Sequence, residues 1–348
     1  MGGRTGKVTI TDVARAAGTS VSSASVALRG EAGVSEGTRE RVLDVARGLG
    51  YEPDQRARVL RQRRSRLIGV TFALGQTFHA DVVEALYAAA GGTGRDLVLS
   101  ATGADRSSAR AAADLLRDRC EELILISPEM TERELVELAG RTDVVTVASD
   151  LRAAGVDAVR SDETRGVAEA LGHLVSLGHR SVTFVDGGNA AMAATRRKSY
   201  VESARRLGLE PRVLGGGVTE ESGVDVADRV LEQRPTAVLA HNDMVAFGLL
   251  LTLRARGIAV PEDVSVVGYD NIRMSSLATV QLTSVSQDAG TLAHKAVERA
   301  VERGSAPAEE IVTPAQLVVR RTSAPPRSSG VLGPAGSPGS PGPDGPDS

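Results

Sequence analysis

The chain has 348 residues, which allows two or three domains, and 41% of its residues are hydrophobic. No apolar run approaches the ~18 residues that a membrane span requires. No apolar segment of the kind found in a secretory signal follows the first charged residues. The composition therefore predicts a soluble protein of the cytoplasm, and the single cysteine, Cys120, excludes an internal disulfide framework.

Charge is distributed unevenly along the chain. Residues 1–66 carry 13 lysines and arginines against 7 acidic residues, a net charge of +6, whereas the rest of the chain has a net charge of −9. A basic head on an acidic body is expected when one end binds a polyanion and the other must not. An ordinary solvated charged face is the alternative, and charge alone leaves it open.

The basic head has the pattern of three short helices. Residues 9–12, Thr-Ile-Thr-Asp, form a capping-box motif, which predicts that the first helix begins at residue 10. Gly18 permits a tight turn, Ser20 is expected to cap a second helix, and Ser35 is expected to cap a third helix that Gly50 ends. This order predicts a helix-turn-helix domain whose second helix enters the DNA major groove. A small helical bundle without a DNA partner is the alternative.

The second predicted helix has side chains that suit the reading of DNA. Its expected solvent face presents Val21, Ser22, Ser25 and Arg29. Hydroxyls can bond phosphates or base edges, an apolar side chain can contact a thymine methyl, and an arginine can read guanine with two hydrogen bonds.

A last short helix is expected after Pro53, over residues 55–62, QRARVLRQ. It has few apolar residues and should be marginal alone. Such a segment could fold on DNA, with Arg58 and Arg61 near phosphates and Leu60 as a wedge between base steps of the minor groove.

The ordered motifs VTITDVARAAGTSVSSASVALRG, VSEGTRERV and LGYEPDQRARVL resemble the head and hinge of the LacI/GalR family of bacterial transcription regulators, and the resemblance extends to about Ser323. It implies a DNA-binding regulator, by the family's predominant mode a repressor, whose operator affinity is controlled by a small-molecule effector such as a sugar. It also implies a homodimer that is not an enzyme and needs no cofactor. The DNA contacts carried over from the family are Thr9, Ser20, Val21, Ser22, Ser25, Ser35, Thr38, Tyr51, Ala57 and Arg58, with Leu60 as the hinge wedge.

From residue 67 onward, β-rich runs alternate with helical stretches. The runs are LIGVTFA, DLVLSA, ELILIS, DVVTVAS, SVTFVDG, TAVLAHND and DVSVVGYD, and the helical stretches include residues 114–119, 162–177 and 242–256. This alternation predicts parallel sheets in two α/β lobes. The resemblance implies a periplasmic-binding-protein-like core, in which the chain crosses between the lobes near Asp162, near residues 283–287 and near the strand QLVVRRT.

The expected domains are a helix-turn-helix domain at residues 8–53, a hinge helix and linker at 54–66, an effector-binding and dimerisation core at 67–323, and a tail at 324–348. The tail is rich in proline, glycine and serine and is expected to be disordered. It has no leucine heptads, so a dimer is expected rather than a tetramer.

Ligands in open parallel α/β lobes bind beyond the carboxyl ends of the strands. Asp270 ends one run and Arg196 begins the helix after another; a carboxylate and a guanidinium suit a polyhydroxylated ligand. In related repressors these two residues match effector-binding positions. By the same resemblance, the remaining effector-binding residues are Asn242, Gln287, Phe72, Phe78 and His79. Packing at a strand end is the alternative for the last three.

Other polar residues of the core are expected to be structural. Asp243 is expected to be a first-turn acid of a helix rather than a ligand contact. The remaining core histidines lack metal-ligand spacing, which predicts structural or surface roles and no metal; they are His173, His179, His241 and His294. A sugar-binding protein or enzyme with a similar core is the alternative function. The lack of a phosphate-binding glycine loop and of a nucleophile motif counts against it.

Overall fold

The computed structural model describes residues 8–29, 33–51, 66–304 and 306–327. They belong to two compact units divided between Ser65 and Arg66. The first unit has three helices, α1 (Ile10–Ala16), α2 (Val21–Arg29) and α3 (Glu36–Gly48). Small and β-branched residues form its core: Val13, Ala14, Ala17, Ala24, Ala27, Val42 and Ala46.

The helix starts of the first unit confirm the expected cap residues, two of which make side-chain cap bonds to the backbone. Thr9 Oγ1 accepts from the backbone N–H of Asp12, and Asp12 Oδ2 accepts from Thr9 N at 3.0 Å, which completes the capping box. The hydroxyl of Ser20 accepts the backbone N–H three residues on at 3.0 Å. Ser35 is the N-cap residue of α3, as expected, but its hydroxyl lies 2.9 Å from Thr38 Oγ1 and makes no cap bond to the backbone.

The second unit begins with a lobe built on a six-stranded sheet whose paired strands are all parallel. The strand order is β11 (Glu310–Thr313), β5 (Val156–Ser161), β4 (Asp143–Val147), β3 (Glu122–Ile126), β1 (Leu67–Ala73) and β2 (Asp96–Thr102). Its helices are α5 (Thr77–Ala90), α6 (Ser108–Arg117), α7 (Glu132–Ala139) and α12 (Ala289–Glu302). We call this part the first lobe.

The second lobe has another six-stranded sheet. Its order is β12 (Gln316–Val318), β10 (Thr283–Ser286), β9 (Ser265–Asp270), β8 (Ala237–Ala240), β6 (Val182–Asp186) and β7 (Arg212–Gly215). Its helices are α8 (Glu163–Ser176), α9 (Ala193–Arg206), α10 (Glu220–Gln233), α11 (Asp243–Ala255) and the 3-10 turn η1 (Arg273–Ser276). The edge strand β12 runs antiparallel to β10, so the expected parallel sheet is corrected at this edge.

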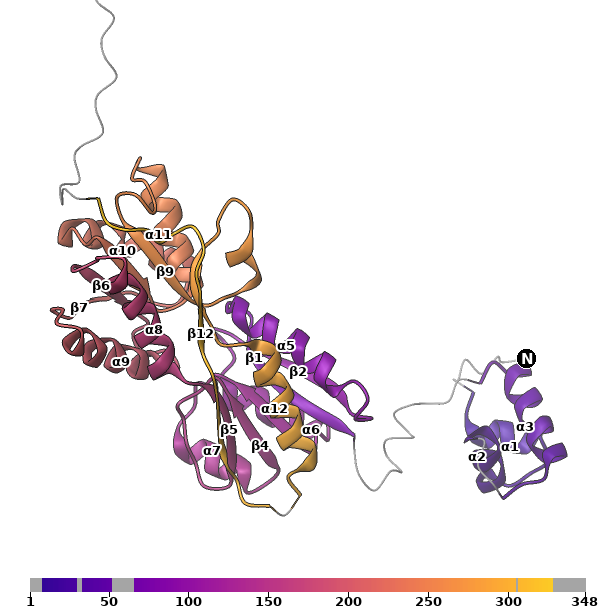
Figure 1. Cartoon of the computed structure of the whole chain (residues 1–348). Coiled ribbons are helices and arrows are strands. Elements are labelled where there is room, and N and C mark those ends of the chain that lie inside the picture. Colours follow the sequence, from indigo (N-terminus) through magenta and orange to yellow (C-terminus); the bar gives the residue numbers. More distant parts are fainter. Residues whose placement is uncertain (1–7, 30–32, 52–65, 305, 328–348) are drawn as a thin grey trace, which may run out of the picture. The chain divides into compact units, whose positions relative to one another are not determined.

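The chain passes between the two lobes three times (Figure 1). It leaves the first lobe after β5, returns after β10, and crosses again between β11 and β12. These places agree with the three expected crossings. The two-lobed α/β fold predicted from the alternation of strands and helices is therefore confirmed.

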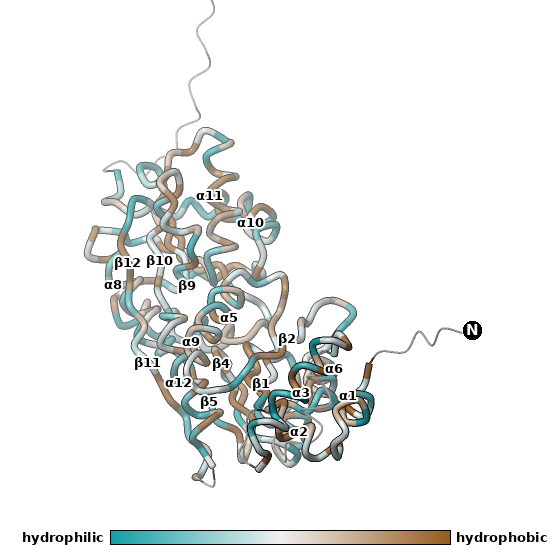
Figure 2. The backbone as a smooth tube through the Cα atoms, turned by 90° about the vertical axis from the view of Figure 1, so that its right-hand side faces the viewer, coloured by the Kyte–Doolittle hydropathy of each residue, from teal (hydrophilic) through white to brown (hydrophobic). Residues whose placement is uncertain are grey.

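Continuous apolar runs explain why most strands could be recognised. All five residues of β3 are buried, as expected for a strand covered on both faces. In Figure 2 the tube is largely brown along β1 and β4. The expected helix at residues 114–119 is displaced, because α6 begins at Ser108 after its cap Ser107 and ends at Arg117.

The strand β5 escaped recognition because it contains charged residues. Asp157 is its second residue and is fully buried. Its Oδ1 accepts from Arg299 Nε and Nη2 at 3.0 and 2.8 Å, and Arg303 Nη1 lies 3.1 Å from its Oδ2. These arginines come from the end of α12, about 140 residues later, so no local pattern reveals that the charge is compensated.

Candidate functional site

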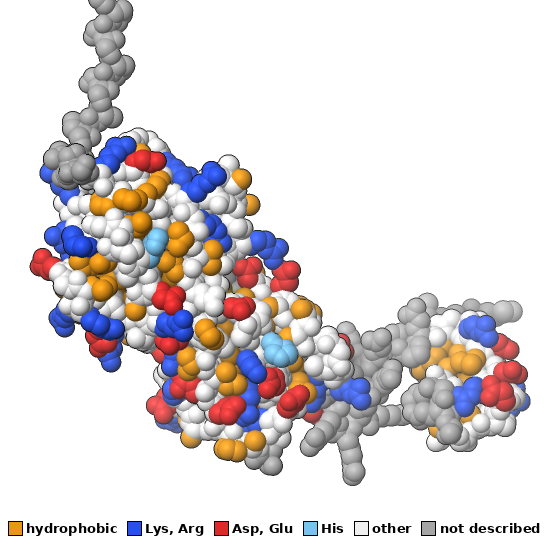
Figure 3. All heavy atoms as spheres, viewed as in Figure 1, with side chains coloured by type: hydrophobic (Ala, Val, Ile, Leu, Met, Phe, Trp, Pro, Cys, Tyr) orange, Lys and Arg blue, Asp and Glu red, His pale blue; other side chains and the backbone are white. Residues whose placement is uncertain are grey.

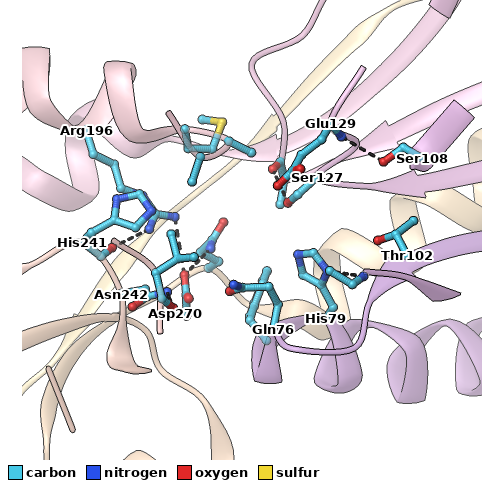
Figure 4. Close-up of a pocket in the computed structure, with 18 residues that line it drawn as sticks. Gln76, His79, Thr102, Ser108, Ser127, Glu129, Arg196, His241, Asn242 and Asp270 are labelled. Atoms are coloured by element: carbon cyan, nitrogen blue, oxygen red, sulfur yellow. Dashed lines mark hydrogen bonds and ion pairs between the residues drawn. The ribbon is translucent and has the colours of Figure 1, made fainter. Parts of the chain in front are cut away.

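A pocket lies between the two lobes, at the carboxyl ends of several parallel strands (Figure 4). The first lobe contributes polar side chains to it, namely Gln76, His79, Thr102, Ser108, Ser127 and Glu129. The second lobe contributes Arg196, His241, Asn242 and Asp270, and Gln287 comes from the crossing after β10. Six of the seven expected effector residues line this pocket, but Phe72 does not.

Arg196 is held by a buried network on the side of the second lobe. Its Nε donates to Glu163 Oε2 at 2.6 Å, its Nη1 donates to the carbonyl oxygen of His241 at 2.6 Å, and its Nη2 lies 3.4 Å from Asp270 Oδ1. The guanidinium stacks on Tyr269, 3.7 Å from the ring centroid. Burial alone would lower the pKa of Arg196, but the two carboxylates raise it above its usual value, so the side chain stays charged.

The same network reaches two of the crossings between the lobes. Gln287 Nε2 donates to Asp270 Oδ1 at 2.6 Å. Ser161 Oγ, at the end of β5, lies 2.7 Å from Glu163 Oε1 and 2.9 Å from Gln287 Oε1. A hydroxyl has one proton, so it serves one of these two acceptors at a time. Side chains that contact the arginine are thus joined to the segments that connect the lobes.

Asp270 is the most exposed carboxyl of this network, with 10% of its side chain accessible. Burial raises its pKa to about 7, and Arg196 offsets part of that rise. The carboxyl group therefore changes protonation near neutral pH. Once ionised, it can accept hydrogen bonds from ligand hydroxyls.

His79 lies across the pocket, in the first turn of α5. Its Nδ1 accepts the backbone N–H of Ala73 at 3.0 Å, and burial lowers its pKa to about 4. The ring is neutral at pH 7, and because Nδ1 is an acceptor, Nε2 carries the proton and can donate. Phe78 lines the pocket beside it.

Phe72 lies within β1 and packs against the apolar core instead of the pocket. For Phe72, the alternative of hydrophobic packing at the strand end is therefore the one that the structure supports. Side chains along a strand alternate between its faces, so neighbours in sequence need not share the pocket.

Asn242 combines a place in the pocket with the cap of α11. Its Oδ1 accepts the backbone N–H of Val245 at 3.0 Å, and its Nδ2 donates to the carbonyl oxygen of Val218 at 2.9 Å. Both ends of the amide are thus used in fixing the start of the helix. Asn242 positions the backbone at this edge of the pocket.

Asp243 is the first residue of α11 and is fully buried, which confirms its expected role as a first-turn acid. Its Oδ2 accepts from Ile272 N at 2.9 Å and from Ser275 Oγ at 2.5 Å, and its Oδ1 accepts from Ser284 Oγ at 2.5 Å. Burial raises its pKa to about 6, and these hydrogen bonds limit the rise. It does not line the pocket.

Several pocket residues were not singled out in the sequence. His241 was expected to be structural or at the surface, yet it lines the pocket immediately before Asn242. Apart from His79, the polar residues of the first lobe were missed because they lie at or after strand ends without a distinctive motif. The available signal was position alone: Thr102 and Ser127 stand at or just after the ends of β2 and β3.

The backbone around the pocket has unusual conformations. Ser127, Ala148, Met192 and Asp270 line it and have positive φ angles of 43°, 49°, 64° and 102°. Non-glycine residues rarely adopt this region, and such strain concentrates at ligand sites. The conformations support a built binding site rather than an incidental hollow.

The first unit places most of the expected DNA contacts where DNA could reach them. Thr9, Ser20, Ser22 and Ser35 are exposed, and Val21, Thr38 and Tyr51 are half-buried. The expectation that Ser25 lies on the solvent face of α2 is wrong, because this residue is only 9% exposed. It follows Ala24, a core residue of this helix, and a small side chain is readily covered by its neighbours. Ala57, Arg58, Leu60, the side chain of Arg29 and the expected hinge helix lie outside the described residues.

The histidines expected to be structural include two that anchor the last described segment. His179 is fully buried, and its Nε2 lies 2.9 Å from the carbonyl oxygen of Ala324, while His173 Nε2 lies 2.9 Å from Ser323 Oγ. Among the described residues no group of three or more potential ligands is arranged to hold a metal ion. Within the same ranges, no helix is both long and apolar enough to cross a membrane.

Comparison with known proteins defines the class of this chain. Residues 9–54 match the family described as bacterial regulatory proteins, lacI family, and residues 171–323 match the periplasmic binding protein-like domain. The transcriptional repressor PurR of Vibrio parahaemolyticus is 30% identical over 306 residues, which cover 85% of this chain and 91% of the relative. This chain belongs to the LacI family of bacterial regulatory proteins.

Solved structures agree with this assignment. A LacI transcriptional regulator from a Rhodococcus species is 41% identical, covers 74% of this chain and 98% of its own, and has a TM-score of 0.73. The lac repressor dimer bound to operator and the anti-inducer ONPF is 26% identical, covers 92% of this chain and 100% of its own, and has a TM-score of 0.79. The protein is therefore a DNA-binding transcriptional regulator. A separate sugar-binding protein or an enzyme with a similar core is not favoured.

Proposed function

We propose that this regulator is a homodimeric repressor of the cytoplasm that binds a palindromic operator and changes its operator affinity when a small polyhydroxylated molecule occupies the pocket. The observation that carries the proposal is the pairing of Arg196 with Asp270 at the carboxyl ends of strands, between two lobes that the chain joins by three crossings. A carboxylate accepts hydroxyl protons and a guanidinium donates to hydroxyl oxygens, so together they suit a sugar.

The roles of the chain follow its expected domains. Residues 8–53 read the operator, with Ser22 and Ser20 exposed at the start of α2. Residues 54–66 link this unit to residues 67–323, which bind the effector and dimerise. In this proposal the effector contacts are Phe78, His79, Arg196, Asp270 and Gln287, and Asn242 fixes the pocket edge.

Effector binding can alter DNA affinity only if the ligand binds two states of the protein unequally. The hydrogen bonds from Gln287 to Asp270 and from Ser161 to Glu163 connect the pocket with two lobe crossings. A ligand hydroxyl that replaces one of these partners changes the bonding at a crossing. A change in the relative position of the lobes is the expected consequence.

The proposal is tested with the full chain. Operator sequences are first selected from a random DNA pool, and a panel of sugars is then screened for release of the selected DNA. Release by a sugar that also raises the melting temperature of the protein supports the proposal. Tight operator binding that no ligand of the pocket alters would contradict it.

A further inference from the structure

The charges of the pocket are unequal, and this inequality bears on the kind of effector that can enter. Arg196 is the one basic side chain among the described residues that line the pocket, whereas Asp270 and Glu129 are acidic. Behind the lining, fully buried Glu163 already pairs with Arg196 at 2.6 Å. The positive charge of Arg196 is thus compensated before any ligand binds.

The two histidines of the pocket do not add positive charge. Burial lowers the pKa of His79 to about 4. Burial and, next, the nearby Arg196 lower the pKa of His241 well below its usual value. Both rings are neutral at pH 7, so they act as hydrogen-bonding groups. His241 Nδ1 is buried and has no hydrogen-bond partner among the described residues.

Glu129 supplies an acid without a basic neighbour. It lies three residues after the end of β3, is exposed, and its backbone N–H donates to Ser108 Oγ at 3.0 Å. No arginine or lysine of the described ranges approaches its carboxylate within 4.0 Å. Figure 4 shows its side chain extending toward the open space between the lobes, on the side opposite Arg196 and Asp270.

An anionic ligand would meet this arrangement unfavourably. A phosphate or carboxylate placed between Glu129 and Asp270 faces the carboxylate of Glu129 and, where it is ionised, that of Asp270, while Arg196, the cation among the described lining residues, is already paired. Like charges repel, and the repulsion is stronger on the buried side of the pocket, at Asp270, than at exposed Glu129. An ammonium group has the opposite preference and can form a charge-assisted hydrogen bond with Glu129.

We propose that the effector is a polyhydroxylated cation, a sugar or sugar-like molecule with a protonated amino group and no anionic group. This inference rests on the proposed function of the pocket. The hydroxyls of the ligand bond with Asp270 and Gln287 at one end, and its ammonium group pairs with Glu129 at the other. Glu129 is therefore the residue that selects the charge of the effector.

The test compares matched sugars on the full chain. The probes are glucose, galactose and mannose, each with its 2-amino, 6-phosphate and uronic acid form, screened by thermal shift and then titrated calorimetrically. The expected result is that an amino sugar binds about fivefold or more tightly than its neutral parent, and that the anionic forms give no shift. Tighter binding of any phosphate or uronate than of the matched amino sugar would overturn the inference and leave the proposed function standing.

Two variants separate the role of Glu129 from general effects. Glu129→Gln is expected to reduce the preference for the amino sugar to about twofold or less, with little change for the neutral parent. Glu210→Gln makes the same chemical change at another exposed acid that does not line the pocket, and it should preserve the preference. An unchanged preference in Glu129→Gln overturns the assignment. If no sugar of any form binds, both this inference and the polyhydroxylated effector of the proposed function are wrong.

Discussion

Arg196 Nε and Glu163 Oε2 lie 2.6 Å apart, and the two side chains are 4% and 0% exposed. A buried ion pair of this kind contributes little net stability, but removing one partner leaves an uncompensated buried charge. Glu163 begins α8, directly after the first crossing between the lobes, and Arg196 lines the pocket. The pair therefore connects the candidate effector site with the start of α8, next to the first crossing between the lobes.

Removal of the arginine is expected to destabilise the protein as well as the site. Arg196→Ala leaves Glu163 buried and unpaired, which should lower the free energy of unfolding by roughly 3–5 kcal/mol. Lys198→Ala is the control on the same helix, because Lys198 is 76% exposed and its pair with Glu202 at 3.9 Å is a surface contact. Its effect should stay below about 1 kcal/mol. Urea denaturation measures both, and equal effects would show that the buried pair is not structural.

Effector binding is expected to depend on pH through Asp270. Its pKa is about 7, so at lower pH the carboxyl is protonated and is a poorer acceptor for ligand hydroxyls. Affinity should rise about tenfold between pH 6 and pH 8 for a neutral sugar that bonds the ionised form. Asp270→Asn keeps the shape of the side chain and should remove the dependence. Calorimetric titrations at several pH values test this. If the pH dependence of the affinity persists in Asp270→Asn, a group other than Asp270 causes it.

The same carboxyl should affect stability with the opposite trend. Its pKa is higher in the folded protein than in the unfolded chain, so the folded state binds the proton more tightly. The contribution of Asp270 is therefore present below about pH 4 and is lost as the pH rises through 7. In the absence of ligand, the unfolding free energy of the parent should therefore fall relative to that of Asp270→Asn as the pH rises through this window. A difference that stays constant with pH would contradict the raised pKa.

Two glycines in helices of the second lobe should respond oppositely to alanine. A Cβ at Gly248 in α11 would collide with the carbonyl oxygen of Glu220 in α10, where the helices approach closely, whereas a Cβ at Gly172 in α8 meets no atom within 4 Å. Gly248→Ala should destabilise by about 1–3 kcal/mol because backbone atoms must move. Gly172→Ala should stabilise by about 0.5–1 kcal/mol through helix propensity. Thermal melts of both variants test the close packing of α10 and α11.

The basic head should make DNA binding depend on salt. With a net charge of +6 over residues 1–66, the logarithm of operator affinity should fall steeply with the logarithm of salt, by roughly 0.9 for each phosphate contacted. Leu60→Gly removes the expected wedge and should reduce specific binding more than non-specific binding at matched salt. Anisotropy titrations with operator and scrambled DNA measure both. A flat salt response, or equal specific binding by Leu60→Gly and the parent, would contradict this account of the head and hinge.

Much of the fold could be predicted because its signals are local. The capping box at Thr9, the φ of +63° at Gly50 and the apolar run of β3 each depend on a few neighbouring residues. The burial of Asp157 depends on arginines from α12 and could not be predicted from β5 itself. On the viewed face of the second unit, acidic and basic side chains are interspersed (Figure 3), so the net charge of −9 over residues 67–348 gives no local guide to a site.

The pocket could be predicted only in part for the same reason. Arg196 and Asp270 were placed by resemblance and by their positions at strand ends, and the structure brings them within 3.4 Å. Glu163 was missed because it follows Asp162, the cap of α8, and has the sequence signature of an ordinary first-turn acid. Glu129 was missed because a single exposed acid after a strand carries no pattern until the opposite lobe is in place.

The central claim is that the pocket and the DNA-binding unit are energetically coupled, and one titration tests it most directly. Operator affinity of the full chain is measured by fluorescence anisotropy with and without a saturating sugar that calorimetry has shown to bind, for the parent and for Asp270→Asn. Coupling of the usual size should change the operator affinity of the parent about 5- to 150-fold, and Asp270→Asn should keep its operator affinity and lose that change. Identical operator affinity of the parent with and without the bound sugar would contradict the account.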